Sequence, residues 1–294
     1  MGRLTCSATR EIAAVDAGAA RWNSCTMPNI DLESYEHVRL HRDGPVLTAT
    51  ITNPEKKNAV NRGITGDFQR LWRDVDADED VRVVVLTGAG NAFCAGVDLS
   101  ALLTTPGAEP RRRKAEAKGI RDRIFDILDC ETPIIAKVRG PAYGMGVNIA
   151  LACDFVIAAD DARLCDSHVK NGITAGDGGV PLIPLMIGFR RAKEMLMLGE
   201  PMTGKEAAEI GLINRSAPED ELDAVVAEYA SKLAAGPPLA LSWTKLSLNI
   251  LLKQMTLGAF ETSIAYDILS LRTNDVQEGS TAFLEKRAPN FTGT

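Results

Sequence analysis

The chain has few of the residues that build metal and disulfide sites. Only three of its 294 residues are histidines, and six are cysteines. The cysteines, at positions 6, 25, 94, 130, 153 and 165, form no Cys-x-x-Cys pair, and no histidine stands near them at metal-ligand spacing. We therefore expect free thiols in a reducing compartment, which indicates a cytoplasmic protein with no metal site and no disulfide framework.

The chain also lacks a positive charge excess and long hydrophobic runs. It carries 33 Lys and Arg against 39 Asp and Glu, a net charge of −6, which argues against nucleic acid as a partner. No run approaches the roughly 18 apolar residues that cross a bilayer, so no membrane partner is expected. The first 26 residues contain no apolar segment typical of a secretion signal. We expect 1–26 to be a disordered N-terminal extension.

Nucleotide-binding fingerprints are incomplete. Gly144-Met145-Gly146 lacks the third glycine and the downstream acidic residue of a dinucleotide site, and Gly204-Lys205-Glu206 lacks the P-loop hydroxyl and preceding glycine. What the composition does supply is an ordinary globular core, with 45% apolar and 24% charged residues. A chain of this length forms one large domain or two.

Hydrophobic periodicity predicts strands and helices in alternation. Apolar residues at 120, 124, 127 and 128 lie on one face of a helix, and the β-branched runs read as strands. The expected strands are 37–40, 46–51, 82–87, 134–138, 154–158 and a short one near 212–216, with a turn at 42–45, a helix over 62–77 and almost only helix from 189 onward. This order predicts an α/β core with a helical C-terminal part.

Two strand-to-turn-to-helix passages, at 83–99 and 134–148, are rich in Gly and Ala. Small residues let the backbone turn tightly with N–H groups pointing outward, so one amide from each turn could stabilise negative charge on a shared oxygen. Tight packing alone is the alternative, because glycine turns are common. Asp98 is expected to cap a helix, and Asp154 to be a satisfied structural acid.

Four segments, 53–61, 95–99, 140–154 and 278–291, resemble the crotonase (enoyl-CoA hydratase/isomerase) superfamily. The resemblance runs from about Tyr35 to the end. It implies a spiral of stacked ββα units over 27–225 and a helical C-terminal trimerisation region over 226–294. The partners it implies are further copies of the chain, in a homotrimer or a dimer of trimers.

The resemblance also implies an acyl-CoA thioester substrate and no prosthetic group, coenzyme A being part of the substrate. Carried over by position, the amides of Val97 and Met145 hold the thioester oxygen. The residues expected to contact coenzyme A are Lys56, Lys57, Ala95 and Lys286. The alternative for the lysines is a plain surface position, because lysines are usually exposed. The Arg111-Arg112-Arg113-Lys114 cluster is expected to be a solvated helix face. The pocket walls are expected from 100–116 and the C-terminal helices.

The catalytic positions depart from the family pattern. Asn148 and His168 stand where hydratases of this family have two glutamates, and an asparagine cannot exchange a proton. His168 titrates near neutral pH and could take a proton from water, with Asp177 orienting it. The alternative is a satisfied pocket histidine. The His…Gly-Asp-Gly-Gly pattern is similar to a branch of the superfamily that hydrolyses carbon–carbon bonds in β-diketones.

The expected function is therefore hydrolysis of a carbon–carbon bond (retro-Claisen) in a β-keto or β-diketone acyl-CoA, through a thioester enolate. Enoyl-CoA isomerisation or an atypical hydration is the alternative, because isomerisation needs only one group that moves a proton. A non-catalytic acyl-CoA-binding paralogue is the third possibility, since fold does not guarantee function.

Overall fold

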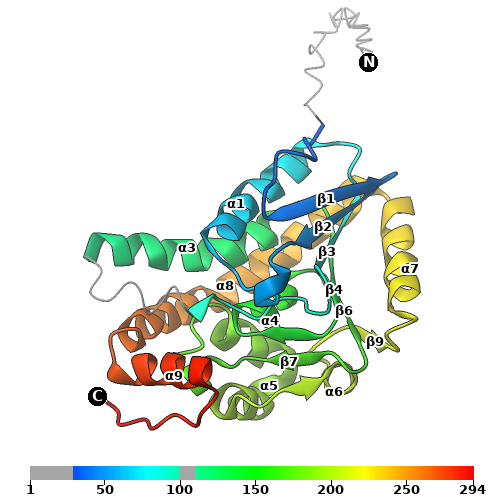
Figure 1. Ribbon diagram of the computed structural model, residues 1–294. Helices are drawn as coiled ribbons and strands as arrows, with labels where there is room; N and C mark the ends of the chain where they lie inside the picture. The colour runs from blue at the N-terminus through cyan, green and yellow to red at the C-terminus, as the bar shows by residue number, and fades with distance from the viewer. Residues whose placement is uncertain (1–28, 100–109) are drawn as a thin grey trace, which may run out of the picture.

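The structure, a computed structural model, describes residues 29–99 and 110–294. Its larger sheet has six strands in the order β1-β2-β3-β4-β6-β9 (Figure 1). Only β1 runs antiparallel to its neighbour, and the other pairings are parallel. The strands are β1 (Val38–Asp43), β2 (Val46–Ile51), β3 (Val83–Gly88), β4 (Ile134–Val138), β6 (Phe155–Ala159) and β9 (Arg215–Ala217).

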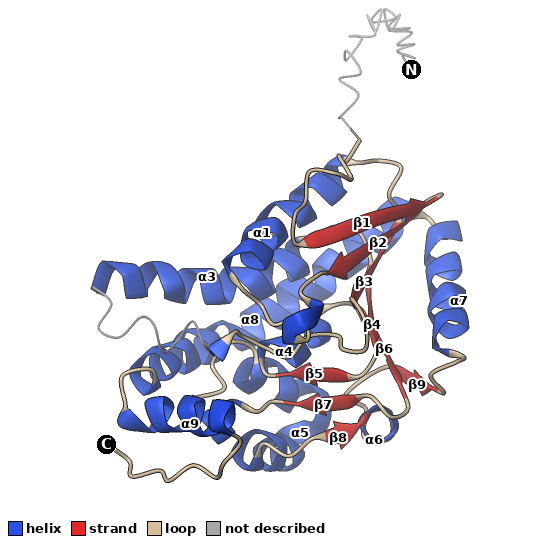
Figure 2. Ribbon diagram, viewed as in Figure 1, coloured by secondary structure: helices blue, strands red, loops and turns tan. Residues whose placement is uncertain are grey.

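A smaller sheet lies beside the larger one and has three strands in the order β5-β7-β8 (Figure 2). These are β5 (Pro141–Tyr143), β7 (Arg163–Cys165) and β8 (Met202–Thr203). Because β4 is followed at once by β5, and β6 by β7, the chain passes twice from the large sheet to the small one. These successive turns are the spiral that the resemblance implied.

Helices cover both faces of the large sheet (Figure 1). α7 packs on one face against β3, β4, β6 and β9, while α4 packs on β4 and β6, and α3 on α1, α4 and α8. The helices are α1 (Arg62–Ala77), α3 (Pro110–Asp129), α4 (Met145–Ala152), α5 (Gly179–Leu198), α6 (Gly204–Glu209), α7 (Leu222–Ala235), α8 (Pro238–Ser270) and α9 (Asn274–Glu285), with short 3₁₀ helices η1 (Pro54–Lys56) and η2 (His168–Asn171).

The central strands are buried because they are sandwiched between helices, and their sequences show it. Each residue of β3 from Val83 to Thr87 is buried, as are Ile134, Ile135 and Ala136 of β4. Such continuous β-branched runs are typical of parallel strands covered on both faces. Within the described residues no helix is long and apolar enough to span a membrane.

The predicted architecture, an α/β core with a helical C-terminal part, is confirmed. The helix over 62–77 and the strand 134–138 match α1 and β4, and the expected apolar face of α3 is buried at Ile124, Ile127 and Leu128. The strands expected at 82–87 and 154–158 begin one residue later. Residues 1–26 lie outside the described residues, as do 100–109 and the side chains of the 111–114 cluster.

Two local predictions are confirmed with shifted bounds. The turn expected at 42–45 is shorter, because β1 continues to Asp43 and pairs with Val46, which leaves Gly44 (φ 54°) and Pro45 to make the turn. The strand expected near 212–216 begins only at Arg215, since Ile213 and Asn214 precede it in a bend. β8, a two-residue strand, was not predicted.

Candidate active site

The two glycine-rich turns pack backbone against backbone. Cys94 bridges Ala142, and the Tyr143 amide donates to the Cys94 carbonyl at 2.9 Å. Neither turn has room for a side chain at its glycine: a Cβ on Gly146 would lie 2.1 Å from the Cys94 carbonyl oxygen, and one on Gly96 (φ 96°) 2.8 Å from that of Tyr143. Glycine is therefore required at both positions for the turns to meet.

The close approach places the two predicted amides on one cavity. Val97 forms an isolated parallel β-bridge with Val60. The Val60 amide donates to the Gly96 carbonyl, and the Asp98 amide donates to the Val60 carbonyl. Met145 is the first residue of α4, where an amide has no partner in its own helix. Within the described residues neither the Val97 nor the Met145 amide donates to a protein acceptor. Both residues line the same cavity.

The cavity has a volume of about 1210 Å³. Its walls come from α1, the two turns, η2, α3, α8 and α9, so the prediction that the C-terminal helices contribute is confirmed. The side chains of the other predicted wall, 100–116, lie outside the described part of the chain. Polar or charged side chains on the wall are His37, Lys57, Asn61, Arg62, Thr65, Gln69, Arg123, Tyr143, Ser167, His168, Asn171, Asp177, Asp267 and Gln277.

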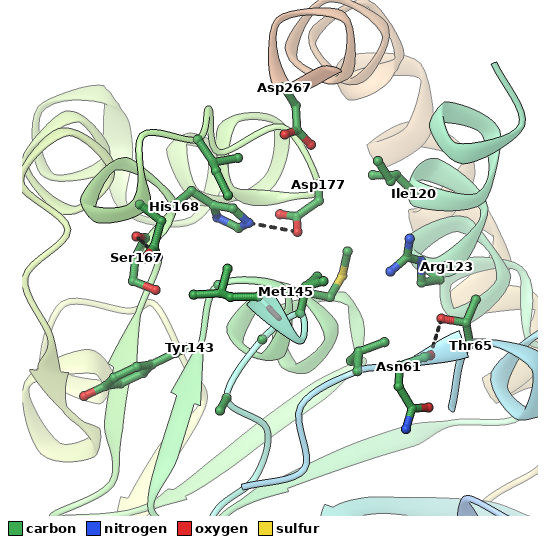
Figure 3. A pocket seen from close by; sticks show the side chains of 18 of the residues that line it. Asn61, Thr65, Ile120, Arg123, Tyr143, Met145, Ser167, His168, Asp177 and Asp267 are labelled. Carbon is green, nitrogen blue, oxygen red and sulfur yellow. Dashed lines mark hydrogen bonds and ion pairs between the residues drawn. The ribbon is translucent and has the colours of Figure 1, made fainter. Parts of the chain in front are cut away.

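His168 lies on this wall between two carboxylates. Its Nδ1 lies 2.6 Å from Asp166 Oδ1 and its Nε2 lies 3.1 Å from Asp177 Oδ2, the second contact being visible in Figure 3. The His168 side chain is 10% exposed. Burial alone lowers the pKa of the imidazole, but the charges of Asp177 and Asp166 outweigh it, and the pKa rises well above its usual range.

The contact between His168 and Asp177 that the sequence suggested is therefore present, but its chemistry differs from the prediction. The raised pKa favours the protonated imidazole, whereas the sequence predicted titration near neutral pH. Burial raises the pKa of Asp177, and the His168 charge more than offsets it, so that the net pKa is lowered. In this ion pair the Asp177 carboxylate, not the imidazole, is the unprotonated member, and its two oxygens face Asn148 Nδ2 and His168 Nε2.

Asn148 donates hydrogen bonds from its side chain to both aspartates. Its side chain is fully buried on α4, and Nδ2 lies 2.7 Å from Asp177 Oδ1 and 3.3 Å from Asp166 Oδ2. Its Oδ1 has no protein partner among the described residues. Asn148, His168 and Asp177 thus meet as the sequence placed them. Asp166 was missed, although an acid two residues before a histidine in an irregular segment is a signal that could have found it.

Glycines allow the Asp177 loop to close over this cluster. Gly178 adopts φ 142°, and a Cβ there would lie 2.8 Å from Asn148 Cβ. A Cβ on Gly179 would lie 2.1 Å from Asp166 Oδ2. The Gly-Asp-Gly-Gly sequence therefore lets Asp177 approach the imidazole without a clash.

Two further charged residues of the wall carried no sequence signal. Asp267 on α8 is only 5% exposed, and burial, with the nearby negative charge of Asp177, raises its pKa to about 7. Arg123 on α3 is also desolvated, and burial lowers its pKa against the opposing charges of Asp177 and Asp267. Both sit in ordinary amphipathic helices, where single charged residues form no motif.

The predicted coenzyme A contacts are only partly at the cavity. Lys57 and Ala95 line it. Lys56 lies with its Nζ 2.6 Å from Asp98 Oδ2. Lys286, the residue that ends α9, is exposed and is not among the lining residues of its own chain.

The two structural roles expected of aspartates have different outcomes. Asp154 accepts from the Ile134 amide at 2.7 Å and pairs with Lys245 at 2.8 Å, which confirms a satisfied structural acid. Leu99, the residue after Asp98, is helical, and the rest of the segment that Asp98 was expected to cap, 100–109, lies outside the described residues.

Asp166, His168 and Asp177 also form a possible metal-ligand set. In the described part of the chain they are the one group of three or more His, Cys, Asp or Glu residues whose ligand atoms lie within 4.8 Å of one another. A metal ion there would have to displace the hydrogen bonds that join the imidazole to the two carboxylates. The geometry fits an ion-pair cluster better than a set of metal ligands, because both imidazole nitrogens already face carboxylates.

Comparisons with known proteins agree with this architecture. Residues 41–294 match the family model described as enoyl-CoA hydratase/isomerase. The chain is 31% identical to a crotonyl-CoA hydratase of Syntrophomonas wolfei over 260 residues, covering 88% of this chain and 98% of that protein. It is 30% identical to the 1,2-epoxyphenylacetyl-CoA isomerase of Escherichia coli over 259 residues, covering 88% and 99%.

The solved structures lead to the same family. An enoyl-CoA hydratase/isomerase from Mycobacterium paratuberculosis superposes with a TM-score of 0.77 at 31% identity, covering 87% of this chain and 98% of that one. The two sheets and the C-terminal helices are those of the crotonase fold. The chain belongs to the enoyl-CoA hydratase/isomerase family, the crotonase superfamily, and is an enzyme of the type that acts on acyl-CoA thioesters.

Proposed function

We propose that this enzyme isomerises an enoyl-CoA by moving a proton along a thioester enolate. The observation that carries the proposal is the Nε2 to Oδ2 contact of 3.1 Å between His168 and Asp177 on the cavity wall. An ion pair of this kind is a single proton-transfer unit, and isomerisation needs only one. Both glutamate positions of the hydratases hold other residues here, Asn148 and His168, which argues against ordinary hydration.

In the proposed reaction the thioester oxygen accepts hydrogen bonds from the amides of Val97 and Met145. The Asp177 carboxylate removes a proton from C2 of a 3-enoyl thioester, and the electron pair moves into the enolate. The same proton then returns at C4, so the double bond shifts to C2 with no water consumed. His168, protonated between its carboxylates, stabilises Asp177 and keeps it oriented, with Asp166 holding the other imidazole nitrogen.

The test is to incubate the purified protein with 3-hexenoyl-CoA and measure formation of the conjugated thioester by absorbance. We expect conversion, with deuterium at C2 or C4 in D₂O wherever the transferred proton exchanges with solvent. Asp177→Asn should abolish both, while Asp161→Asn, a change at an exposed aspartate, should not. Conversion at the wild-type rate by the Asp177→Asn variant would refute the assignment.

A second candidate is retro-Claisen hydrolysis of a β-keto or β-diketone acyl-CoA. It needs two proton-transfer groups, and Asp267, with a pKa of about 7, is a second one on the same wall. Asp177 would take a proton from water while the oxygen of that water bonds to the ketone carbon. The carbon–carbon bond would then break, its electron pair forming the thioester enolate, which Asp267 would protonate. Hydration needs two groups as well.

Isotope labelling separates these outcomes. With a β-keto thioester in H₂¹⁸O, hydrolysis places ¹⁸O in a new carboxylate and shortens the thioester. Hydration of a 2-enoyl thioester places ¹⁸O in a hydroxyl group on an intact chain. Isomerisation incorporates no ¹⁸O.

The apolar surface supports a homotrimer or dimer of trimers as the assembled form. Large apolar side chains project to solvent along the C-terminal helices of the single chain. On α8 they include Leu239, Trp243, Leu248, Ile250, Leu251, Met255, Leu257, Tyr266 and Leu269. Many exposed apolar side chains along one helix are typical of a subunit interface.

A further inference from the structure

The guanidinium of Arg123 points into the cavity from α3 (Figure 3). Its Nε donates to the Gly119 carbonyl of the same helix at 3.0 Å. Among the described residues no carboxylate lies within ion-pair distance of it, and neither of its terminal nitrogens has a hydrogen-bond partner in the protein. The neighbouring Arg121, in contrast, pairs with Glu261 at 2.7 Å and with Asp122 at 3.3 Å.

A largely buried arginine without an ion-pair partner is costly. Arginine stays protonated in proteins, and a desolvated charge needs a compensating partner. The nearest carboxylates of the wall are already engaged or neutralised: Asp177 accepts from His168 and Asn148, and Asp267 is largely protonated below pH 7. The terminal N–H groups of the Arg123 guanidinium therefore face the cavity.

Arg123 lies on the far side of Asp177 from His168. Figure 3 shows the Asp177 carboxylate between the imidazole and the guanidinium, with Met145 below them. A thioester whose oxygen binds at the Met145 amide, next to the pair, would extend its acyl chain along this wall. Ile120 of α3 supplies an apolar surface beside the guanidinium.

We propose that the acyl group of the substrate carries a second carboxylate, which the guanidinium of Arg123 binds through two parallel hydrogen bonds. This inference rests on the proposed function in one respect, that the thioester end of the substrate binds at the Val97 and Met145 amides. Arginine binds carboxylates in this bidentate way because its planar fork matches the two oxygens. Asp267 would be held protonated by the bound carboxylate and would donate to it instead of repelling it.

The test compares two saturated thioesters of equal chain length by calorimetry, glutaryl-CoA and pentanoyl-CoA. Neither can be isomerised, so binding is measured apart from turnover. We expect glutaryl-CoA to bind roughly 10- to 100-fold more tightly, the effect of a charge-assisted hydrogen-bond pair. Arg123→Gln should remove that preference and leave pentanoyl-CoA unchanged. Arg123→Lys, which keeps the charge without the fork, should restore part of it, and Arg121→Gln should preserve it.

Two results would overturn the inference. Equal affinity of the wild-type protein for both thioesters would show that no carboxylate is recognised. Equal losses for both thioesters in Arg123→Gln would show that Arg123 only balances Asp177 and Asp267 or binds the coenzyme A part. Failure of the proposed function looks different, since the wild-type protein would then still bind glutaryl-CoA more tightly than pentanoyl-CoA but would not convert 3-hexenoyl-CoA.

Discussion

Gly146 is the tightest contact between the two turns that carry the proposed oxygen-binding amides. Its substitution by alanine places a Cβ 2.1 Å from the Cys94 carbonyl oxygen and 2.9 Å from the carbonyl carbon. Since a carbon and an oxygen pack at roughly 3.5 Å, the turns must separate by about 1.4 Å to relieve the contact fully. A displacement of that size moves one amide out of hydrogen-bond range, and the loss of one such donor costs about 3 kcal/mol, or roughly 10²- to 10³-fold in turnover.

The assay measures turnover of 3-hexenoyl-CoA together with the infrared carbonyl frequency of a bound ¹³C-labelled thioester. We expect Gly146→Ala to lose activity by that factor, and the bound carbonyl to vibrate closer to its frequency in water. Overpacking also destabilises folds by about 1–3 kcal/mol, so urea unfolding is measured alongside.

Gly258→Ala is the matched control, because a Cβ at that position of α8 meets no atom within 4 Å. It should leave both turnover and the carbonyl frequency unchanged. A Gly146→Ala protein that retains wild-type turnover with an unshifted carbonyl frequency would refute the reasoning.

Four further outcomes are expected. Asp177→Asn should lower turnover by roughly 10²- to 10⁴-fold while acyl-CoA affinity measured by calorimetry stays within a few fold, and an equal loss of affinity would contradict its catalytic role. The pKa of Asp267 is raised to about 7 from the usual 3.8, so the folded protein binds an extra proton between these pH values and its stability falls as pH rises through this window. The Asp267→Asn variant should therefore gain about 4 kcal/mol of stability relative to the wild type between pH 4 and pH 8 in urea unfolding. Parallel curves of stability against pH would contradict the raised pKa. Lys245→Met should cost about 3–5 kcal/mol because it leaves the carboxylate of Asp154 desolvated and unpaired, and a second change, Asp154→Leu, should recover part of that loss. Trp243→Glu, at an exposed apolar position of α8, should convert the proposed trimer to monomers in light scattering, and an unchanged mass would contradict an interface at this position.

Periodicity and turn chemistry were enough to predict the architecture. The buried runs at Val83–Gly88 and Ile134–Val138 and the helix Arg62–Ala77 come from short-range patterns that tertiary contacts reinforce. The edges were less predictable. β1 extends to Asp43 because it pairs along its whole length with β2, and that pairing is not encoded in its own six residues.

For the site, too, the sequence could predict some features and not others. The sequence could place Asn148, His168 and Asp177, since motifs and spacing fix their positions along the chain. It could not give the protonation of His168, because that depends on Asp166 lying 2.6 Å from Nδ1 and on burial of the whole cluster. Asp267 and Arg123 reach the cavity only through the packing of α8 and α3, a contact between segments more than a hundred residues apart.

A crystal structure with a bound acyl-CoA tests the central claim most directly. We expect the thioester oxygen to lie about 2.7–3.1 Å from both the Val97 and the Met145 nitrogen, with C2 of the acyl chain next to the Asp177 carboxylate. A thioester oxygen bound elsewhere, or an acyl chain that leaves the His168–Asp177 pair out of reach, would contradict the account.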